Sequence, residues 1–210
     1  MSWKLATKLK AHLEKEEGYY VFPAGQRERM ALVYPNSYFV GMSNLGIHII
    51  YDLMNRRGDT ACERFFLPEK KELEEYKRTN TPLLSLETQT PLSEFPLIAF
   101  AVSFEMDYFN LLEILSTGRV PLLASERGDD APIVIAGGPC ATFNPEPLSD
   151  FVDAFIIGEG EETMQHFMDA FYGAKAEGLG KKELLRRLAK VEGVYVPSLY
   201  EHSFADDGTL

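Results

Sequence analysis

Residues 132–162 read PIVIAGGPCATFNPEPLSDFVDAFIIGEGEE. Two apolar runs in this stretch, 133–136 and 154–157, are too short for helices, and each ends at a glycine. Buried parallel strands show this pattern where they open onto a ligand crevice. We therefore expect two neighbouring strands whose ends lie side by side.

Glycines follow both runs: Gly137 and Gly138 after the first, Gly158 and Gly160 after the second. A glycine has no Cβ, so its backbone can adopt φ > 0 and can be approached closely by a bulky partner. The sequence thus predicts a ligand against these glycines.

Strand and helix patterns alternate through the rest of the chain. Strands are expected at 30–34, 60–66 and 97–102, with minor ones at 83–87 and 194–196. Apolar residues at helical spacing predict helices near 5–18, 44–57, 108–117, 161–173 and 181–190. The charged stretch 68–80 is expected at the surface, with a short helix at 69–78. Such alternation requires right-handed crossovers. The predicted fold class is α/β, with a doubly wound, mainly parallel sheet.

Length and composition fit one α/β domain with a substantial core, since 45% of the 210 residues are apolar and 25% are charged. We divide the chain into an N-terminal helical extension (1–28), a Rossmann-like domain (29–178) and a helix-plus-strand linker toward further protein (179–210). The N-terminal helix is expected on the outside of the domain or against another domain.

Several classes of protein are disfavoured. No apolar run approaches the ~20 residues needed to span a bilayer, and the N-terminus lacks a signal-peptide pattern. The net charge of −11 argues against binding to nucleic acid, which needs a basic face. Two cysteines, Cys62 and Cys140, cannot form a disulfide framework, so we expect a reducing cytoplasm.

A doubly wound sheet binds its ligand at the carboxyl edge of the strands. That edge carries no Gly-x-Gly-x-x-Gly loop and no Walker lysine, and Ser103 stands where a phosphoacceptor aspartate would follow the third strand. Glu159, Glu161 and Glu162 open a helix, where they repel phosphate but can accept hydrogen bonds. The sequence therefore predicts a large, donor-rich, mostly neutral ligand.

Four strings at this edge carry a family resemblance. They are ALVYPNSYFVGMSNLG at 31–46, FAVSFE at 100–105, GGP at 137–139 with NPEP at 144–147, and IGEGE at 157–161. Together, in this order, they resemble the N-terminal region of radical S-adenosylmethionine (SAM) proteins that carry a cobalamin-binding-type domain. The resemblance covers residues 17–200. It implies a flavodoxin-like Rossmann fold with strand order 2-1-3-4-5.

In that family a catalytic barrel follows the domain and holds a [4Fe-4S] cluster and S-adenosylmethionine on a Cys-x-x-x-Cys-x-x-Cys loop. This loop is absent here, so we expect the chain to be part of a longer protein whose missing barrel carries the cluster. The chain alone is expected to have no catalytic residues, whereas the parent protein resembles a radical SAM enzyme.

The resemblance also implies a corrinoid partner, but the loop that would supply a lower ligand to cobalt departs from the known pattern. Cobalamin domains that ligate cobalt use Asp-x-His-x-x-Gly after the first strand, but residues 36–41 read NSYFVG. Bound cobalamin is therefore expected base-off, with no metal ligand in this chain. For His48 a structural or solvated role is favoured, and for Cys140 that of an ordinary buried or loop thiol.

The candidate cofactor-binding residues are those that the resemblance and the strand ends place at the edge. They are Asn36, Ser37, Tyr38, Gly41, Ser103, Phe104, Gly137, Gly138, Pro139, Thr142, Gly158, Glu159, Gly160 and Glu161. Ser103 is the best candidate for a polar contact to the tail base of the cofactor, because a strand-end hydroxyl has few other partners. Glu159 and Glu161 have two equally plausible roles, which are to complement the helix dipole or to contact the ligand.

Three readings stay open at this point. The first is a cobalamin-binding module of a radical SAM enzyme, and the second is a docking module with the same fold that binds no cobalamin. The third, an independent flavodoxin-like or receiver-like domain, is disfavoured because both a phosphate loop and an acidic pocket are lacking. Visible absorption of a bound corrinoid separates the first two.

Overall fold

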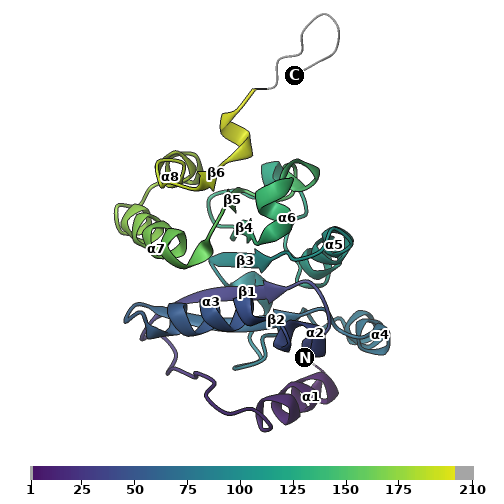
Figure 1. The fold of residues 1–210 in the computed structure, drawn as a ribbon. Coiled ribbons are helices and arrows are strands. Elements are labelled where there is room, and N and C mark those ends of the chain that lie inside the picture. Colours follow the sequence, from purple (N-terminus) through teal and green to yellow (C-terminus); the bar gives the residue numbers. More distant parts are fainter. Residues whose placement is uncertain (1, 202–210) are drawn as a thin grey trace, which may run out of the picture.

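The computed structural model describes residues 2–201 and contains one six-stranded sheet (Figure 1). The strands are β1 (Glu28–Tyr34), β2 (Thr60–Phe66), β3 (Leu97–Ala101), β4 (Ile133–Gly137), β5 (Ala154–Ile156) and β6 (Val194–Tyr195). Their order is β2-β1-β3-β4-β5-β6. All neighbours pair in parallel except β5 and β6, which are antiparallel. The predicted doubly wound fold and the 2-1-3-4-5 order are confirmed.

Helices cover both faces of this sheet (Figure 1). They are α1 (Trp3–Leu13), α2 (Tyr38–Met42), α3 (Leu45–Arg56), α4 (Lys70–Thr79), α5 (Asp107–Thr117), α6 (Pro139–Phe143), α7 (Gly160–Ala176) and α8 (Lys181–Leu188). Short 3₁₀ helices are η1 (Leu92–Glu94), η2 (Ala124–Glu126), η3 (Glu146–Leu148) and η4 (Pro197–Leu199). Among the described residues, no helix is long and apolar enough to cross a membrane.

The central strands are apolar throughout because both of their faces are covered. In β1, Leu32 belongs to a core cluster shared with α3, α7 and α8, while Val33 belongs to a second cluster shared with α5 and α6. Side chains alternate between the faces of a strand, so a strand buried on both sides reads as a continuous apolar run. This explains why the central strands could be recognised in the sequence.

The outer strand β2 has its outward backbone groups bound by other parts of the chain. The amide of Asn55 donates to the Cys62 carbonyl and accepts from the Cys62 N–H, at 3.1 and 3.0 Å. The Arg64 N–H donates to Glu87 Oε2 at 2.7 Å, and the Arg64 carbonyl accepts from the Leu86 N–H. Arg27 donates to the Thr60 carbonyl. Little of this sheet edge is left unpaired.

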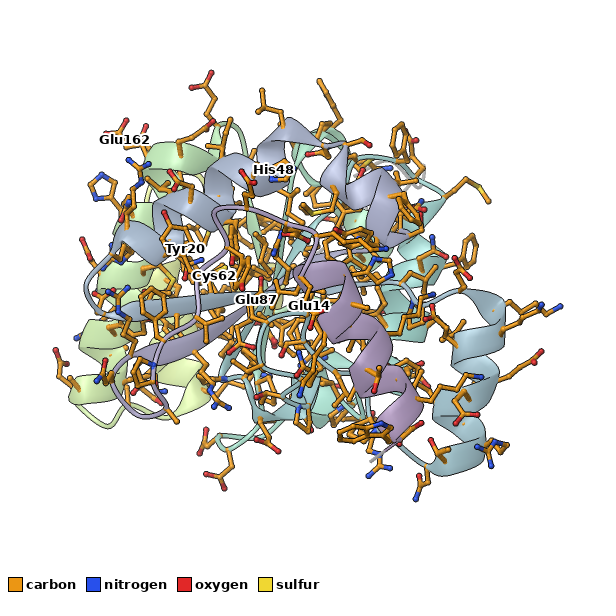
Figure 2. The ribbon with its side chains drawn as sticks, turned by 90° about the horizontal axis from the view of Figure 1, so that it is seen from below. Glu14, Tyr20, His48, Cys62, Glu87 and Glu162 are labelled. Carbon is orange, nitrogen blue, oxygen red and sulfur yellow. The ribbon has the colours of Figure 1, made fainter. Side chains whose placement is uncertain are left out.

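The side chain of Arg64 lies buried in the same region. Its Nε donates to Glu87 Oε1 at 2.7 Å, its Nη2 lies 2.7 Å from Glu16 Oε2, and its guanidinium stacks 4.3 Å from the Tyr51 ring. Burial raises the pKa of Glu87, and the neighbouring Arg64 cation opposes this rise. Figure 2 labels Glu87 and Cys62 near the middle of the molecule, close to Tyr20 of the N-terminal extension. One cation thus joins β2, the segment 83–92 and the N-terminal extension.

Several predicted elements differ in the structure. Residues 83–87 form no strand and make a single isolated β-bridge, between Leu84 and Pro91. Leu86 and Glu87 instead form hydrogen bonds with the outer edge of β2. Helix α1 ends at Leu13, short of Gly18, and α7 continues past Gly173 to Ala176. Residues 36–41, expected as a loop, contain the start of α2.

Helix α1 of the N-terminal extension contributes to both core clusters. Leu5 and Leu13 of α1 are buried in the two core clusters, and Lys8 pairs with Glu72 of α4 at 2.7 Å. The expected linker 179–210 begins with α8 and β6 as predicted, and its residues 202–210 lie outside the described part of the chain.

We predict that Glu87→Gln lowers the free energy of unfolding at neutral pH by about 3 kcal/mol or more, because it leaves a buried cation with less compensation. Chemical denaturation monitored by circular dichroism measures this. Lys77→Gln is the control, since Lys77 pairs with Glu113 on the surface and such pairs contribute about 0–1 kcal/mol. Equal effects of the two substitutions would contradict the central role of the Arg64 cluster.

Candidate functional site: a cleft at the carboxyl edge of the sheet

A cleft of about 320 Å³ opens at the carboxyl edge between α3, α7 and the sheet. Its floor is a row of register partners, in which Ala99 of β3 pairs with Leu32 of β1 and with Ile135 of β4. Ile50 of α3 and Met164 of α7 line its sides. The residues at its mouth include Asn44, Ser103, Gly137, Gly138, Pro139, Gly158, Gly160 and Glu161. An apolar interior with a few polar groups at the entrance is typical of small-molecule sites.

The turn after β4 brings backbone rather than side chain to the mouth of the cleft. Gly138 has φ +102°, and a Cβ at this position would lie 2.7 Å from the Val102 carbonyl oxygen. The same carbonyl accepts from the Cys140 N–H at 3.3 Å, and the Val102 N–H donates to the Gly137 carbonyl at 2.8 Å. These bonds hold the carboxyl ends of β3 and β4 together. The two backbones approach so closely that residue 138 must lack a Cβ.

The four glycines at this edge differ in backbone conformation. Gly158 has φ +91°, but Gly137 and Gly160 have no positive φ, and a Cβ on either would make ordinary contacts at 3.5 Å. Gly160 is the first residue of α7, so its backbone is helical. Positive φ thus occurs at Gly138 and Gly158, whereas Gly137 and Gly160 line the cleft with ordinary backbone angles.

Ser103 lies at the mouth of the cleft, half-buried, with one neighbour that the sequence did not suggest. Asn44 caps α3, its Oδ1 accepting from the Ile47 N–H at 3.2 Å, and its Nδ2 donates to Ser103 Oγ at 3.3 Å. The capping position of Asn44 was predictable, but its contact with Ser103, which is distant in sequence, was not.

The predicted residues of the first loop lie away from this cleft. Asn36 Nδ2 donates to Asp107 Oδ1 at 2.9 Å and its Oδ1 accepts from the Ser37 N–H, while Gly41 packs against the Phe66 ring. None of them lines the cleft, because α2 turns this loop toward α1.

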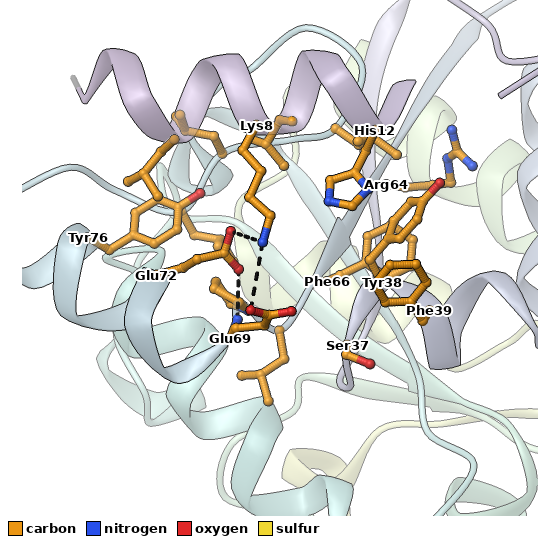
Figure 3. A pocket seen from close by; sticks show the side chains of 17 residues that line it. Lys8, His12, Ser37, Tyr38, Phe39, Arg64, Phe66, Glu69, Glu72 and Tyr76 are labelled. Atoms are coloured by element: carbon orange, nitrogen blue, oxygen red, sulfur yellow. Dashed lines mark hydrogen bonds and ion pairs between the residues drawn. The ribbon is translucent and has the colours of Figure 1, made fainter. Parts of the chain in front are cut away.

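Tyr38 belongs to a separate, small cavity of about 60 Å³ under α1 (Figure 3). Its hydroxyl donates to Glu16 at 2.8 Å and its ring lies 4.3 Å from that of His12. Burial, with Glu16 beside the hydroxyl, raises the pKa of Tyr38 to about 12. Tyr38 therefore anchors the loop to the N-terminal extension.

The remaining predicted residues surround the cleft without lining it. Thr142 Oγ1 accepts from the Gly158 N–H at 3.1 Å, which ties α6 to the end of β5. Glu159 is exposed just before α7, and Phe104 is exposed after β3.

Large apolar side chains are exposed around the same edge, from the loops and helices that follow β1, β3 and β4. They are Phe39, Val40, Leu45, Phe104, Met106, Phe109 and Phe143. We call them the apolar rim. Phe143 is 87% exposed and Met106 is 74% exposed. Several large apolar side chains exposed around one edge are candidates for contact with a ligand or another protein.

His48 is engaged within the fold (Figure 2). Its Nε2 lies 2.9 Å from the Met42 carbonyl oxygen, so this nitrogen carries the hydrogen and donates. The structural role favoured from the sequence agrees with this contact. Within residues 2–201, no three His, Cys, Asp or Glu side chains are placed to hold a metal ion.

Asp107 is a buried acid beside the first loop. Its Oδ1 accepts from the amides of Asn36 and Asn110, whereas its Oδ2 has no hydrogen-bond partner among the described residues. Burial raises the pKa of Asp107, and the two amide donors oppose that shift. Sequence reasoning missed this residue because nothing local distinguishes it from other acids that begin a helix.

Comparison with known proteins gives two matches. Residues 46–197 match the family model described as radical SAM proteins, N-terminal. The chain is also 26% identical over 174 residues to the uncharacterized protein MJ0966 of Methanocaldococcus jannaschii, covering 82% of this chain and 32% of that protein. The chain thus spans about a third of the length of this relative. No solved structure matches.

We predict that Gly138→Ala destabilises the protein by about 1–3 kcal/mol, because the substitution combines a strained φ with a clash against backbone. Gly137→Ala is the matched control and should change stability by less than about 1 kcal/mol, since its Cβ meets only ordinary contacts. Thermal and urea unfolding of both variants measure the difference. Similar stability for the two variants would show that the turn is unstrained.

A second prediction concerns pH and Asp107. A carboxyl whose folded pKa is raised contributes stability below its unfolded pKa, about 3.9, and loses that contribution as pH rises through the folded pKa. Wild type should therefore lose stability relative to Asp107→Asn as the pH rises above ~4, as measured by urea unfolding at a series of pH values. Asp130→Asn, at an exposed acid, controls for the loss of one charge. A difference that does not vary with pH would refute the assignment.

Proposed function

We propose that this chain, which belongs to the family of N-terminal regions of radical SAM proteins, is the module that binds a corrinoid at the carboxyl edge of its sheet. The observation that carries this proposal is the apolar cleft of about 320 Å³, whose mouth includes the bare backbone of Gly138 and the hydroxyl of Ser103. A cleft of this size and lining suits one flat heteroaromatic group.

We place the nucleotide tail of the corrinoid in this cleft. Its base would lie over the apolar row Leu32, Ala99 and Ile135, where burial of a ring is favourable. The Ser103 hydroxyl would provide the polar contact at the mouth. The tail would pass the backbone of Gly138, which lines the cleft without a side chain.

The corrin itself would lie over the edge, bound base-off. The apolar rim would cover part of its face, and the exposed carboxylates of Glu159 and Glu161 could accept hydrogen bonds from its peripheral amides. The loop after β1 has no histidine, and His48 Nε2 is bound to the Met42 carbonyl, so neither that loop nor His48 would offer an imidazole to the cobalt. When bound, the corrinoid would supply a cobalt centre.

The rest of the proposed protein supplies the radical chemistry. The [4Fe-4S] cluster and SAM would belong to a catalytic domain beyond this chain, in keeping with its covering 32% of the M. jannaschii relative. The free, buried thiols of Cys62 and Cys140 suit a reducing cytoplasmic setting, which we include in the proposal.

A docking module without corrinoid is the second candidate. The apolar rim favours it, because side chains as exposed as Phe143 and Met106 could pack directly against the catalytic domain. In that case the cleft would have no ligand, and the edge would serve only to position the partner domain.

Titration with cob(II)alamin separates the candidates. We expect binding at one corrinoid per chain by visible absorption, and an electron paramagnetic resonance spectrum without nitrogen superhyperfine splitting. His48→Ala should leave both unchanged, because His48 is bound within the fold.

Two results would count against this proposal. Nitrogen splitting that disappears in His48→Ala would show a histidine beneath the cobalt and overturn the base-off assignment. No binding of corrinoid by folded protein would instead favour the docking module.

A further inference from the structure

The orientation of the Asn44 side chain is fixed by two contacts at once. The group that faces the Ile47 N–H must be an acceptor, so it is the amide oxygen. The amide nitrogen consequently faces Ser103, to which it donates at 3.3 Å. The capping bond therefore decides which end of the amide Ser103 meets.

This contact sets the polarity of the Ser103 hydroxyl. Its oxygen accepts from Asn44, and an amide NH₂ cannot accept the hydroxyl hydrogen in return. Among the described residues, no other group accepts that hydrogen from Ser103. Ser103 and Asn44 both line the cleft, so the hydrogen is free to point into it.

We propose that Asn44 is a specificity-determining residue of the cleft, acting through Ser103. By holding Ser103 as a donor, it selects a flat ring with an acceptor atom, such as an unprotonated ring nitrogen, over a ring of the same shape that lacks one. The proposal rests on the proposed function in that the ring would be the tail base of the corrinoid. The polarity argument itself applies to any ring that enters the cleft.

Asn44→Asp tests this with little change to the fold. Aspartate caps a helix as well as asparagine does, so one carboxylate oxygen can still accept from the Ile47 N–H. The other oxygen then faces Ser103 and accepts its hydrogen. The hydroxyl is thereby turned away from the ligand, although its position is unchanged.

Two neutral probes of the same shape make the readout specific. 1-Methylbenzimidazole has an unprotonated ring nitrogen where 1-methylindole has C–H, and both are neutral at mildly alkaline pH. In nuclear magnetic resonance titrations, we expect wild type to bind methylbenzimidazole about tenfold more tightly, roughly the effect of one hydrogen bond. This preference should vanish in Asn44→Asp.

Ser103→Ala is the matched variant. It should also abolish the preference, and adding Asn44→Asp to it should change nothing further, because Asn44 acts through the Ser103 hydroxyl. A preference that persists in Asn44→Asp, or a further loss in the double variant, would overturn the proposal. So would failure of both probes to bind wild type.

Corrinoids separate this inference from the proposed function. Asn44→Asp should weaken cobalamin binding while leaving cobinamide, which lacks the tail base, unaffected. If wild type binds neither corrinoid but prefers methylbenzimidazole, the polarity of the cleft stands and the corrinoid function fails. If both corrinoids bind and are weakened equally by Asn44→Asp, Asn44 does not act on the tail base and the inference fails.

Discussion

The buried guanidinium of Arg64 is the interaction on which the assembly of this domain depends. Its positive charge is 2% exposed and is balanced by Glu87 and Glu16, which come from segments far apart in the sequence. A buried charge without its partner is costly, so the three segments are stable only together. Tyr38 extends this coupling to the carboxyl edge, because its hydroxyl also binds Glu16. The N-terminal extension therefore helps to shape the loop after β1.

The cleft itself follows from how two helices leave the sheet. Helix α3 follows β1 and leads to the outer strand β2, whereas α7 follows β5. Both helices pack in the same core cluster, on one face of the sheet, but they lie over different strands. The floor between their first turns is built partly from alanine at positions 99 and 101. Small floor residues leave space that larger ones would fill, and the cleft is the result.

The sequence predicted the parts of this structure that local patterns determine. Apolar runs identified β1, β3, β4 and β5, and the strand-end positions of Ser103 and Gly138 placed them at the cleft. Residues 83–87 were predicted as a strand because several of them are apolar. In the structure this segment forms no strand, and Glu87 instead accepts a hydrogen bond from the backbone at the edge of β2. Tyr38 was placed with the ligand because nothing local reveals its bond to Glu16. Contacts between distant segments were thus the part that patterns could not supply.

The closed margins of the sheet bear on how the protein behaves at high concentration. The outward backbone of β2 is occupied by Asn55 and Glu87, and β6 at the opposite margin has two residues, with Pro197 soon after. Neither margin offers a long unpaired row of N–H and C=O groups that could template an incoming strand from another molecule. Polymerisation by strand addition is therefore disfavoured in the folded state. A domain that exposes Phe143 and Met106 can then meet its partners through side chains without also seeding fibrils.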